Sequence, residues 1–547
     1  MSRRLPWALP LVALVVITGL VTVASWRSHG GVLALVRGQR AAQPRMLDAR
    51  VSVSGGSDAP YRVTVTVDTS RVLAALPPEF LSFSIDASQV TGGKWWDPMA
   101  RGTESGSGTV HAPVFDFTRP ALGVLVDGLA PAYLRIGGSE SDKVFYDLEP
   151  ASTERRAPPP GYESTLSRDE WDALNTFAAR HQLGVVFTLN AGPSSRDRDG
   201  RWDGANAEAL LRYTKERDYP VRVWELGNEV NNFWFVFGVR QQISTARYHD
   251  DLTIARALVT HHTPAARLSG QGSMFWPVLG EPLSLLFGFM PSYLERSGDL
   301  VDQVSWHYYP QQSRRGPVAT RRASPARMLD PANLDEAGYW ANKVRDWRDR
   351  HAPGRPLWLG ETGNAQFGGE PGLSDSYLAG LWWLDELGLM ARSGMQVVVR
   401  QTLAGMNYGL IDDATLAPRP DYWASLLWKR LMGDRVLATR VEGTSGSHLR
   451  AYAHVGPEGA LTVLLINLDP TRDASVTLPV LGARDRAEYA VTAPELFGQT
   501  VLLNGAALGL TAGGALPATA GVSARGGAHT PVVIHPLSYS FVTVKPR

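Results

Sequence analysis

Between residues 79 and 434, two patterns of hydrophobic and polar residues follow each other along the chain, one typical of strands and one typical of helices. Short apolar runs end in polar or glycine-rich turns, and between them lie segments with apolar residues at helical spacing. Ser167 and Glu170 have the spacing of a capping box at the start of the helix predicted at 168–182, and Gly184 is expected to end that helix. Eight strands, each followed by a helix or by room for one, predict a (β/α)8 TIM barrel. The predicted strands are 80–88, 131–138, 183–192, 221–229, 266–272, 301–309, 356–362 and 395–405.

The pattern changes after about residue 435, where helical spacing stops. Short alternating strands with Gly, Pro, Asn and Asp turns follow, which predicts a β-sandwich over residues 435–547. An earlier strand in 59–78 alternates with period two and is expected to join that sandwich. The predicted fold class is therefore α/β, a barrel over 79–434 with a C-terminal β-sandwich.

The first residues form an apolar segment. Arg3 and Arg4 precede about twenty uncharged residues, a length that can span a bilayer. A cleaved signal peptide is the alternative, with small residues near Ala24 and Ser25 as a possible cleavage site. The long apolar core favours an uncleaved anchor over residues 1–26, followed by a flexible tether over 27–58. Either interpretation predicts an exported protein, and the anchor predicts attachment to a membrane.

Composition narrows the function classes. A hydrophobic share of 44% and a charged share of 20% are ordinary for a folded protein of 547 residues. A net charge of +1 gives no electrostatic reason to expect a nucleic-acid partner. The absence of cysteine excludes disulfides and thiolate chemistry. The 17 tryptophans suit a carbohydrate-binding cleft, since aromatic faces pack against the C–H side of sugar rings.

Two glutamates end two of the predicted strands. Glu229 closes VRVWELGNE at 221–229, and Glu361 lies near the end of RPLWLGET at 355–362. The carboxyl ends of barrel strands meet on one face, so both side chains are expected there. Glycoside hydrolysis needs such a pair, because one carboxyl group protonates the leaving oxygen while the other attacks the anomeric carbon or activates water. The alternative is two buried acids held by arginines in structural ion pairs.

Several segments resemble the heparanase and β-glucuronidase family of retaining glycoside hydrolases, family 79. They include AYLRIGG, WELGNE, VSWHYY, WLGET and VVVRQTLAGMNYGL, and they follow the family's order from about residue 80 to the C-terminus. The resemblance implies a barrel with a β-sandwich, double displacement, and a β-linked glucuronic acid at the cleaved bond. It implies a carbohydrate substrate and neither a metal nor an organic cofactor.

Roles for the two glutamates come from this resemblance. Glu229 resembles the acid/base and Glu361 the nucleophile, while Asn228 would hydrogen-bond the sugar 2-hydroxyl. Physical chemistry sets a requirement on each: Glu229 needs an apolar setting or a nearby carboxylate to stay protonated, and Glu361 needs donors to stay ionised.

Candidate donors and sugar contacts complete the site. Arg135 is expected to donate to Glu361, with His307 and Tyr309 as further candidates, although His307 could equally be a packed core histidine. Tyr408 and the backbone around Gly368 resemble the family's site for the glucuronate carboxylate. Asp86, Ser139 and Gln401 match the positions of the family's sugar or cleft contacts. For Asp86 and Gln401, a purely structural role is the alternative.

Departures from the family bear on the substrate. The turn after Glu229 is apolar where the animal enzymes have lysine, and Phe367 replaces a loop glycine. An aromatic wall is therefore expected from Phe233, Trp234, Phe275 and Trp276.

The loop after the sixth strand favours a charged substrate instead. It carries only basic charges, which could bind sulfate or carboxylate or could simply be solvated. Its five arginines are Arg314, Arg315, Arg321, Arg322 and Arg327.

Three functions remain open. They are a β-glucuronidase or heparanase-like hydrolase, a hydrolase of the same scaffold acting on a neutral sugar, and a non-catalytic carbohydrate-binding envelope protein. The short Pro-rich loop at 147–167 predicts activity without proteolytic maturation. Exo or endo cleavage and the oligomeric state are left open by the sequence.

Overall fold

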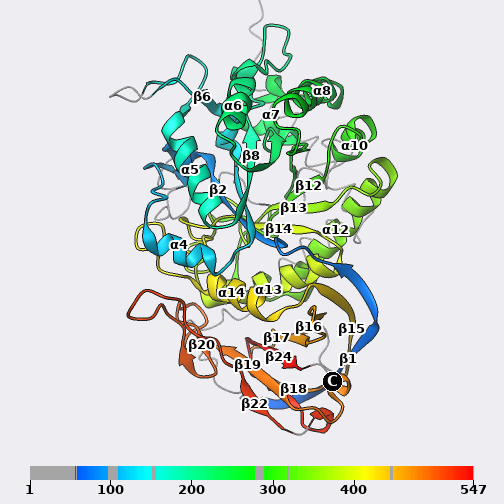
Figure 1. Cartoon of the computed structure of the whole chain (residues 1–547). Coiled ribbons are helices and arrows are strands. Elements are labelled where there is room, and N and C mark those ends of the chain that lie inside the picture. The colour runs from blue at the N-terminus through cyan, green and yellow to red at the C-terminus, as the bar shows by residue number, and fades with distance from the viewer. Residues whose placement is uncertain are drawn as a thin grey trace, which may run out of the picture.

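The computed structural model describes residue 56 and residues 58–96, 109–150, 156–276, 289–316, 320–443, 448–525 and 527–545. The predicted anchor or signal peptide at 1–26, and nearly all of the predicted tether at 27–58, lie outside these residues. No helix in the described part of the chain is long and apolar enough to cross a membrane. Figure 1 shows two sheets, the upper one surrounded by helices, with helices α13 and α14 between it and the lower one.

The first sheet is parallel and curled. Its strand order is β10-β9-β8-β5-β2-β14-β13-β12-β11, and every neighbouring pair runs in the same direction. The predicted mixed α/β fold with a parallel sheet is therefore confirmed. The strands are β2 (Leu81–Asp86), β5 (Ala132–Gly137), β8 (Leu183–Leu189), β9 (Val221–Leu226), β10 (Arg267–Ser269), β11 (Ser273–Phe275), β12 (Val304–Tyr308), β13 (Leu357–Thr362) and β14 (Val397–Arg400).

The two ends of this sheet are neighbours along the chain. The strand predicted at 266–272 is shorter, as β10, and a second short strand, β11, begins three residues after it. Isolated parallel bridges join Asn228 to Gly272 and Ser269 to Gln303. The break lets the chain pair first with β9 and then with β12.

Helices follow the strands of the parallel sheet. The capping box predicted at the start of α5 is confirmed, with Ser167 and Glu170 each bonding the other's backbone N–H. Gly184 does not close that helix, which ends at Arg180, because Gln182 takes the left-handed turn and Gly184 lies in β8. The helices between and after the strands are α4 (Pro120–Asp127), α5 (Arg168–Arg180), α6 (Ala205–Glu216), α8 (Thr245–His262), α10 (Met290–Ser297), α12 (Pro331–His351), α13 (Tyr377–Arg392) and α14 (Pro420–Leu431).

The second sheet is mainly antiparallel and has its own apolar core. Strand β1 pairs with β15 in antiparallel and with β18 in parallel register, so the first described strand lies among the last ones (Figure 1). The predicted domain boundaries stay predictions. The strands are β1 (Asp58–Ala75), β15 (Arg435–Gly443), β16 (Leu449–Val455), β17 (Leu461–Asn467), β18 (Arg472–Thr477), β19 (Arg486–Thr492), β20 (Leu502–Leu503), β21 (Ala506–Ala507), β22 (Val522–Ala524), β23 (Val532–Ile534) and β24 (Ser538–Val544).

A buried polar contact joins helix α13 to the second sheet. Asp385 of α13 accepts from Arg450 Nε at 2.7 Å and from the Tyr452 hydroxyl at 2.5 Å, and both donors lie on β16. Burying a carboxylate is costly unless its oxygens are bonded, so this contact fixes how α13 sits on the second sheet.

Candidate active site

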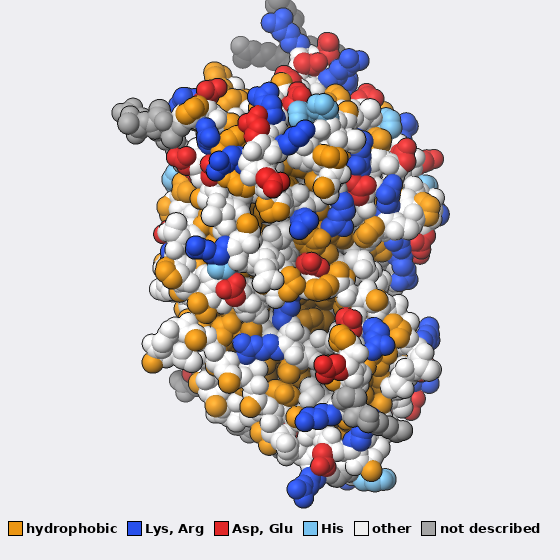
Figure 2. Space-filling model, viewed as in Figure 1, with side chains coloured by type: hydrophobic (Ala, Val, Ile, Leu, Met, Phe, Trp, Pro, Cys, Tyr) orange, Lys and Arg blue, Asp and Glu red, His pale blue; other side chains and the backbone are white. Residues whose placement is uncertain are grey.

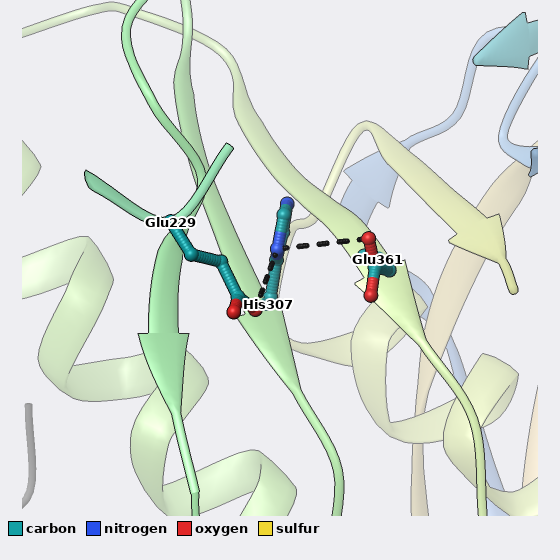
Figure 3. A group of neighbouring side chains, drawn as sticks. All are labelled: Glu229, His307 and Glu361. Atoms are coloured by element: carbon teal, nitrogen blue, oxygen red, sulfur yellow. Dashed lines mark hydrogen bonds and ion pairs between the residues drawn. The ribbon is translucent and has the colours of Figure 1, made fainter. Parts of the chain in front are cut away.

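Glu229 and Glu361 face each other at the carboxyl end of the parallel sheet. Glu361 belongs to β13, and Glu229 follows β9 in a left-handed conformation with φ 49°. Both residues are buried, and one carboxylate oxygen of each lies within 4.8 Å of the other. Figure 3 shows the two side chains approaching from separate strands on either side of His307.

Two donors hold Glu361. Arg135 Nη1 donates to its Oε2 at 2.9 Å, and the Tyr309 hydroxyl donates to its Oε1 at 2.6 Å. The same guanidinium donates to Glu225 at 2.7 Å and is almost fully buried. An arginine stays protonated at any physiological pH, so a fixed positive charge and a hydroxyl both stabilise a negative charge on Glu361.

Glu229 has the opposite environment. Burial raises its pKa well above the usual carboxyl value, and the charge of Glu361 raises it further. Its carboxyl group has a hydrogen-bond partner in His307, whose Nδ1 lies 3.0 Å from Oε1. His307 is expected from the sequence to be one of the donors to Glu361. The structure corrects this, because Nδ1 lies 3.9 Å from Glu361 and nearer to Glu229 (Figure 3).

His307 itself is neutral. Burial lowers its pKa well below the ordinary imidazole value, and the charge of Arg135 lowers it further. A neutral imidazole next to Glu229 adds a hydrogen bond without adding a positive charge that would favour loss of the proton from Glu229.

Asn228 is fixed on both its side chain and its backbone. Its Oδ1 accepts from Arg135 Nη2 at 2.8 Å and from the Gly138 N–H at 3.2 Å, while its own N–H donates to Asp142 Oδ2 at 2.9 Å. Asp142 also accepts from the Ala191 N–H at 2.8 Å, and burial raises its pKa to about 7. Because Oδ1 is bonded, the Nδ2 group is the end of Asn228 that can bind a sugar hydroxyl. Sequence reasoning missed Asp142, whose only signal was its position in the loop after a strand that ends in two glycines.

The carboxylates open into a cleft of about 420 Å³. Arg135 and His307 do not line it and lie behind the two glutamates. Gly368 is also absent from the lining, although its neighbour Phe367 contributes. Eight of the predicted catalytic and substrate-binding residues line the cleft: Asp86, Ser139, Asn228, Glu229, Tyr309, Glu361, Gln401 and Tyr408.

Two of these lining residues also have structural contacts. Asp86 caps the short helix α3 (Ala87–Thr91) by accepting from the Ser88 N–H, and burial raises its pKa to about 8. Gln401 accepts a hydrogen bond from the Ser84 hydroxyl and shares another with Tyr408. Both residues therefore combine a structural contact with a place on the cleft wall.

The arginine loop is not a free basic rim. Arg314 Nε donates to the buried Glu370 at 2.6 Å, and Arg321 is paired with Glu336 of α12. Arg315 lines the cleft and donates to Asn407 Oδ1 at 2.5 Å. Acids outside the loop, which its local sequence does not show, neutralise Arg314 and Arg321, so fewer of the five arginines are available to bind an anion.

The aromatic wall exists, but with different members. Phe233 and Phe275 are buried in the core around the parallel sheet. Within the described residues, the aromatic side chains that line the cleft include Trp96, Phe235, Trp276 and Phe367. Sequence reasoning missed Trp96, which lies on β3 (Gly93–Trp96), a strand outside the parallel sheet.

Glu229, His307 and Glu361 offer donor atoms within 4.8 Å of one another, a group that could hold a metal ion. A cation there would compete with the Arg135 guanidinium and the Tyr309 hydroxyl for the oxygens of Glu361. It would also displace the proton that burial favours on Glu229. The donor set suits proton transfer better than metal binding.

Comparisons with known proteins agree with this chemistry. Residues 62–388 match the family model described as "Glycosyl hydrolase family 79, N-terminal domain". The chain is 33% identical to heparanase of Rattus norvegicus over 493 residues, covering 80% of this chain and 85% of the relative. It is 31% identical to heparanase-like protein 1 of Arabidopsis thaliana, covering 78% and 84%. Among solved structures, a GH51 arabinofuranosidase from Xanthomonas axonopodis pv. citri shares the fold with TM-score 0.62 and 15% identity, over 89% of this chain and 100% of that one.

Proposed function

The chain belongs to glycosyl hydrolase family 79, and on that premise we propose that it is a retaining β-glucuronidase, acting on glucuronides or on glycans that contain uronic acid. The observation that carries the proposal is the pair Glu229 and Glu361, with one carboxylate oxygen of each within 4.8 Å in opposite electrostatic settings. Retaining enzymes separate their carboxyl groups by about 5 to 5.5 Å, and inverting ones by about 6.5 to 9.5 Å. The short separation supports retention.

In the first step Glu361 is the nucleophile. Its ionised carboxylate attacks the anomeric carbon, and the bond from that carbon to the leaving oxygen breaks. Glu229 gives its proton to the leaving oxygen, so the aglycone departs as a neutral alcohol. Arg135 and Tyr309 support this step by stabilising the negative charge of Glu361 before the attack.

In the second step Glu229 acts as base. Ester formation removes the charge of Glu361, which is the second largest cause of the raised pKa of Glu229. The pKa of Glu229 therefore falls when the intermediate forms, and its carboxylate can take a proton from the incoming water. Water attacks the anomeric carbon, the ester bond breaks, and Glu361 and protonated Glu229 are restored.

A uronic acid is proposed for the sugar site. Tyr408 lines the cleft, and the Gly368 carbonyl, in the loop after β13, accepts from the N–H of the neighbouring Asn407 at 2.9 Å. Arg315 adds a positive charge there, because a Cβ placed on Gly368 would lie 2.7 Å from its Nη1. A hydroxyl, a glycine-rich backbone and a guanidinium are suitable partners for a sugar carboxylate.

The test compares an aryl β-glucuronide with the matching β-glucoside. The wild-type protein should cleave the glucuronide preferentially. Tyr408→Phe should weaken transition-state binding of the glucuronide by about 1 to 3 kcal/mol and affect the glucoside less, since a donor to a charged group is removed. Equal losses on both sugars, or a wild-type preference for the glucoside, would favour a neutral-sugar hydrolase.

Two further features belong to the proposal. We infer that the curled sheet is a closed (β/α)8 barrel, which the bridges from 228 to 272 and from 269 to 303 support. We also propose that the protein is exported, because a basic start followed by about twenty uncharged residues is typical of signal sequences and anchors.

A further inference from the structure

Beside the two glutamates, one end of the cleft is lined by aromatic rings. We infer that Trp96, Phe235, Trp276 and Phe367, called the aromatic wall below, form a subsite for an uncharged planar leaving group such as a fused-ring phenol. The inference rests on the proposed function, because it assumes that a glycoside is cleaved between Glu229 and Glu361.

The aromatic wall is one continuous row of rings. Phe235 lies 5.4 Å from Trp276, Trp276 lies 5.6 Å from Phe367, and Phe367 lies 5.4 Å from Trp96, as distances between ring centroids. The interplanar angles are 80°, 79° and 72°, so each ring meets the next edge to face. Edge-to-face pairs are favourable and hold each other's orientation, which makes the row a preformed surface.

The end of the aromatic wall formed by Phe235 and Trp276 lies on the side where the leaving group departs, while Trp96, at the other end, lies beside Gly368. Phe235 belongs to α7 (Phe233–Val236), which begins four residues after Glu229. The amide of Asn231 clamps this segment to Met274, accepting from its N–H at 3.1 Å and donating to its carbonyl at 3.3 Å. The clamp brings Trp276 next to the segment that carries the acid. Because Glu229 protonates the leaving oxygen, the group attached to that oxygen is expected to lie against this surface.

The backbone of Phe367 indicates that its ring position is built in. The residue has φ 62°, a left-handed conformation that large side chains rarely adopt. Its ring packs over Gly316, where an added Cβ would lie 2.1 Å from it, and between Trp96 and Trp276. Strained residues of this kind are concentrated at ligand sites, where the surrounding structure holds them.

The four side chains of the aromatic wall carry no charge, which favours an uncharged occupant there. The described lining residues carry three basic groups, Lys94, Lys143 and Arg315, against four carboxyl groups, Asp86, Glu140, Glu229 and Glu361. Lys143 is already paired with Glu140 at 2.9 Å. Asp86 and Glu229 keep a proton, so Lys94 and Arg315 remain as the positive groups of this set, and the Arg315 guanidinium lies at the proposed site of the sugar carboxylate. Figure 2 likewise shows charges of both signs mixed over one face of the molecule, and hydrophobic side chains gathered in a hollow near its middle.

The test uses two β-glucuronides of the same fused-ring phenol, one uncharged and one with a sulfonate on the distal ring. The wild-type protein should prefer the uncharged substrate by at least about tenfold in kcat/KM. Phe235→Ala and Phe367→Gly should reduce that preference about tenfold, mainly through KM, since lost ring contacts on this scale correspond to a tenfold change. Tyr339→Ala, which removes an exposed aromatic ring on α12 away from the cleft, should leave the preference unchanged.

Equal kcat/KM for the two substrates, or a wild-type preference retained in Phe235→Ala, would overturn the inference. Phe235 is 36% exposed, so its truncation is compatible with folding even if Phe367→Gly is not. The β-glucosides of the same two phenols separate the two proposals. If only the glucosides are cleaved, the glucuronate site is refuted, but their ratio of kcat/KM still tests whether the aromatic wall prefers the uncharged phenol. If neither sugar is cleaved, binding of the two free phenols, followed by tryptophan fluorescence, decides whether the wall selects uncharged rings.

Discussion

The protonation of each glutamate is set by residues from different strands. Arg135 on β5 and Tyr309 just after β12 stabilise the charge of Glu361, while burial and that same charge keep a proton on Glu229. One carboxylate thus determines the state of the other. This coupling is the physical basis for assigning different roles to two chemically identical side chains.

Substituting each glutamate separately tests the role assignment. Glu361→Gln removes the nucleophile and should abolish turnover of every substrate. Glu229→Gln should retain more activity on an aryl glucuronide whose phenol leaves without protonation, because only the acid step is lost. Steady-state rates on an activated and an unactivated substrate measure this. Loss of the same fraction in both variants on the activated substrate would contradict the assignment.

Asp86 should make stability depend on pH. Burial raises its pKa from 3.8 to about 8, so the folded protein keeps a proton that the unfolded chain releases above about pH 4. This stabilising contribution is complete below pH 4 and is lost as pH rises through about 8. Asp86→Asn keeps the cap on α3 and removes the titration. Its unfolding free energy should therefore fall less between pH 4 and pH 8, by on the order of a few kcal/mol.

Denaturant unfolding of both proteins at the two pH values measures this difference. Asp142, whose burial raises its pKa to about 7, acts in the same direction in both proteins and cancels in the comparison. A parallel pH dependence in wild type and Asp86→Asn would show that Asp86 is not the group that titrates.

The sequence pointed to the two glutamates as candidate catalytic residues, but it did not show which side chains contact them. The two glutamates stood out because each ends an apolar run, and that pattern is local. The contact of His307 with Glu229 depends on how β9 and β12 sit across the sheet. The hydrogen bonds of Asp142 to Asn228 and Ala191 require three loops to lie side by side, which no local sequence pattern predicts.

At the scale of elements, ion pairs bind the loop after β12 to its neighbours. Glu370, in the loop after β13, accepts from the Ser313 hydroxyl at 3.0 Å and from the Arg314 N–H at 2.8 Å, and Glu336 of α12 is paired with Arg321. These arginines therefore order the loop. Their part in binding an anionic polymer is correspondingly smaller than their sequence indicates.

Glu370→Gln tests this view of the loop. It weakens buried hydrogen bonds to a charged group and should lower the unfolding free energy by about 1 to 3 kcal/mol. Arg322→Ser is the control, since Arg322 is exposed and a surface change usually costs less than about 0.5 kcal/mol. Denaturant unfolding gives both values. Equal stability of the two variants would show that the loop is held by other contacts.

Elements were predicted better where their signals are local. The capping box of α5 involves residues three positions apart, so the sequence contained it entirely. The break between β10 and β11 arises from pairing with two different strands, which no window along the chain reveals. The aromatic wall shows the same limit: Phe233 and Phe235 are two positions apart, yet one is buried in the core and the other lines the cleft.

At the scale of the whole molecule, the parallel sheet was readable from repeated strand and helix patterns, and the family match supports it. Which residues bridge the two sheets was not readable. Asp385 and Arg450 come from elements far apart in sequence, and their contact depends on how α13 packs against β16. The intact chain is expected to be active without proteolytic cleavage, because the loop at 147–167 is short.

The central claim is that Glu229 and Glu361 cleave a glycoside with retention, and the stereochemistry of the first product tests it most directly. Proton NMR of the intact protein acting on an aryl β-glucuronide can follow the anomeric signal before the free sugar mutarotates. Two displacements at the anomeric carbon predict that the β-anomer of glucuronic acid forms first. Initial release of the α-anomer would show a single inverting displacement and contradict the account, as would the absence of any released glucuronic acid.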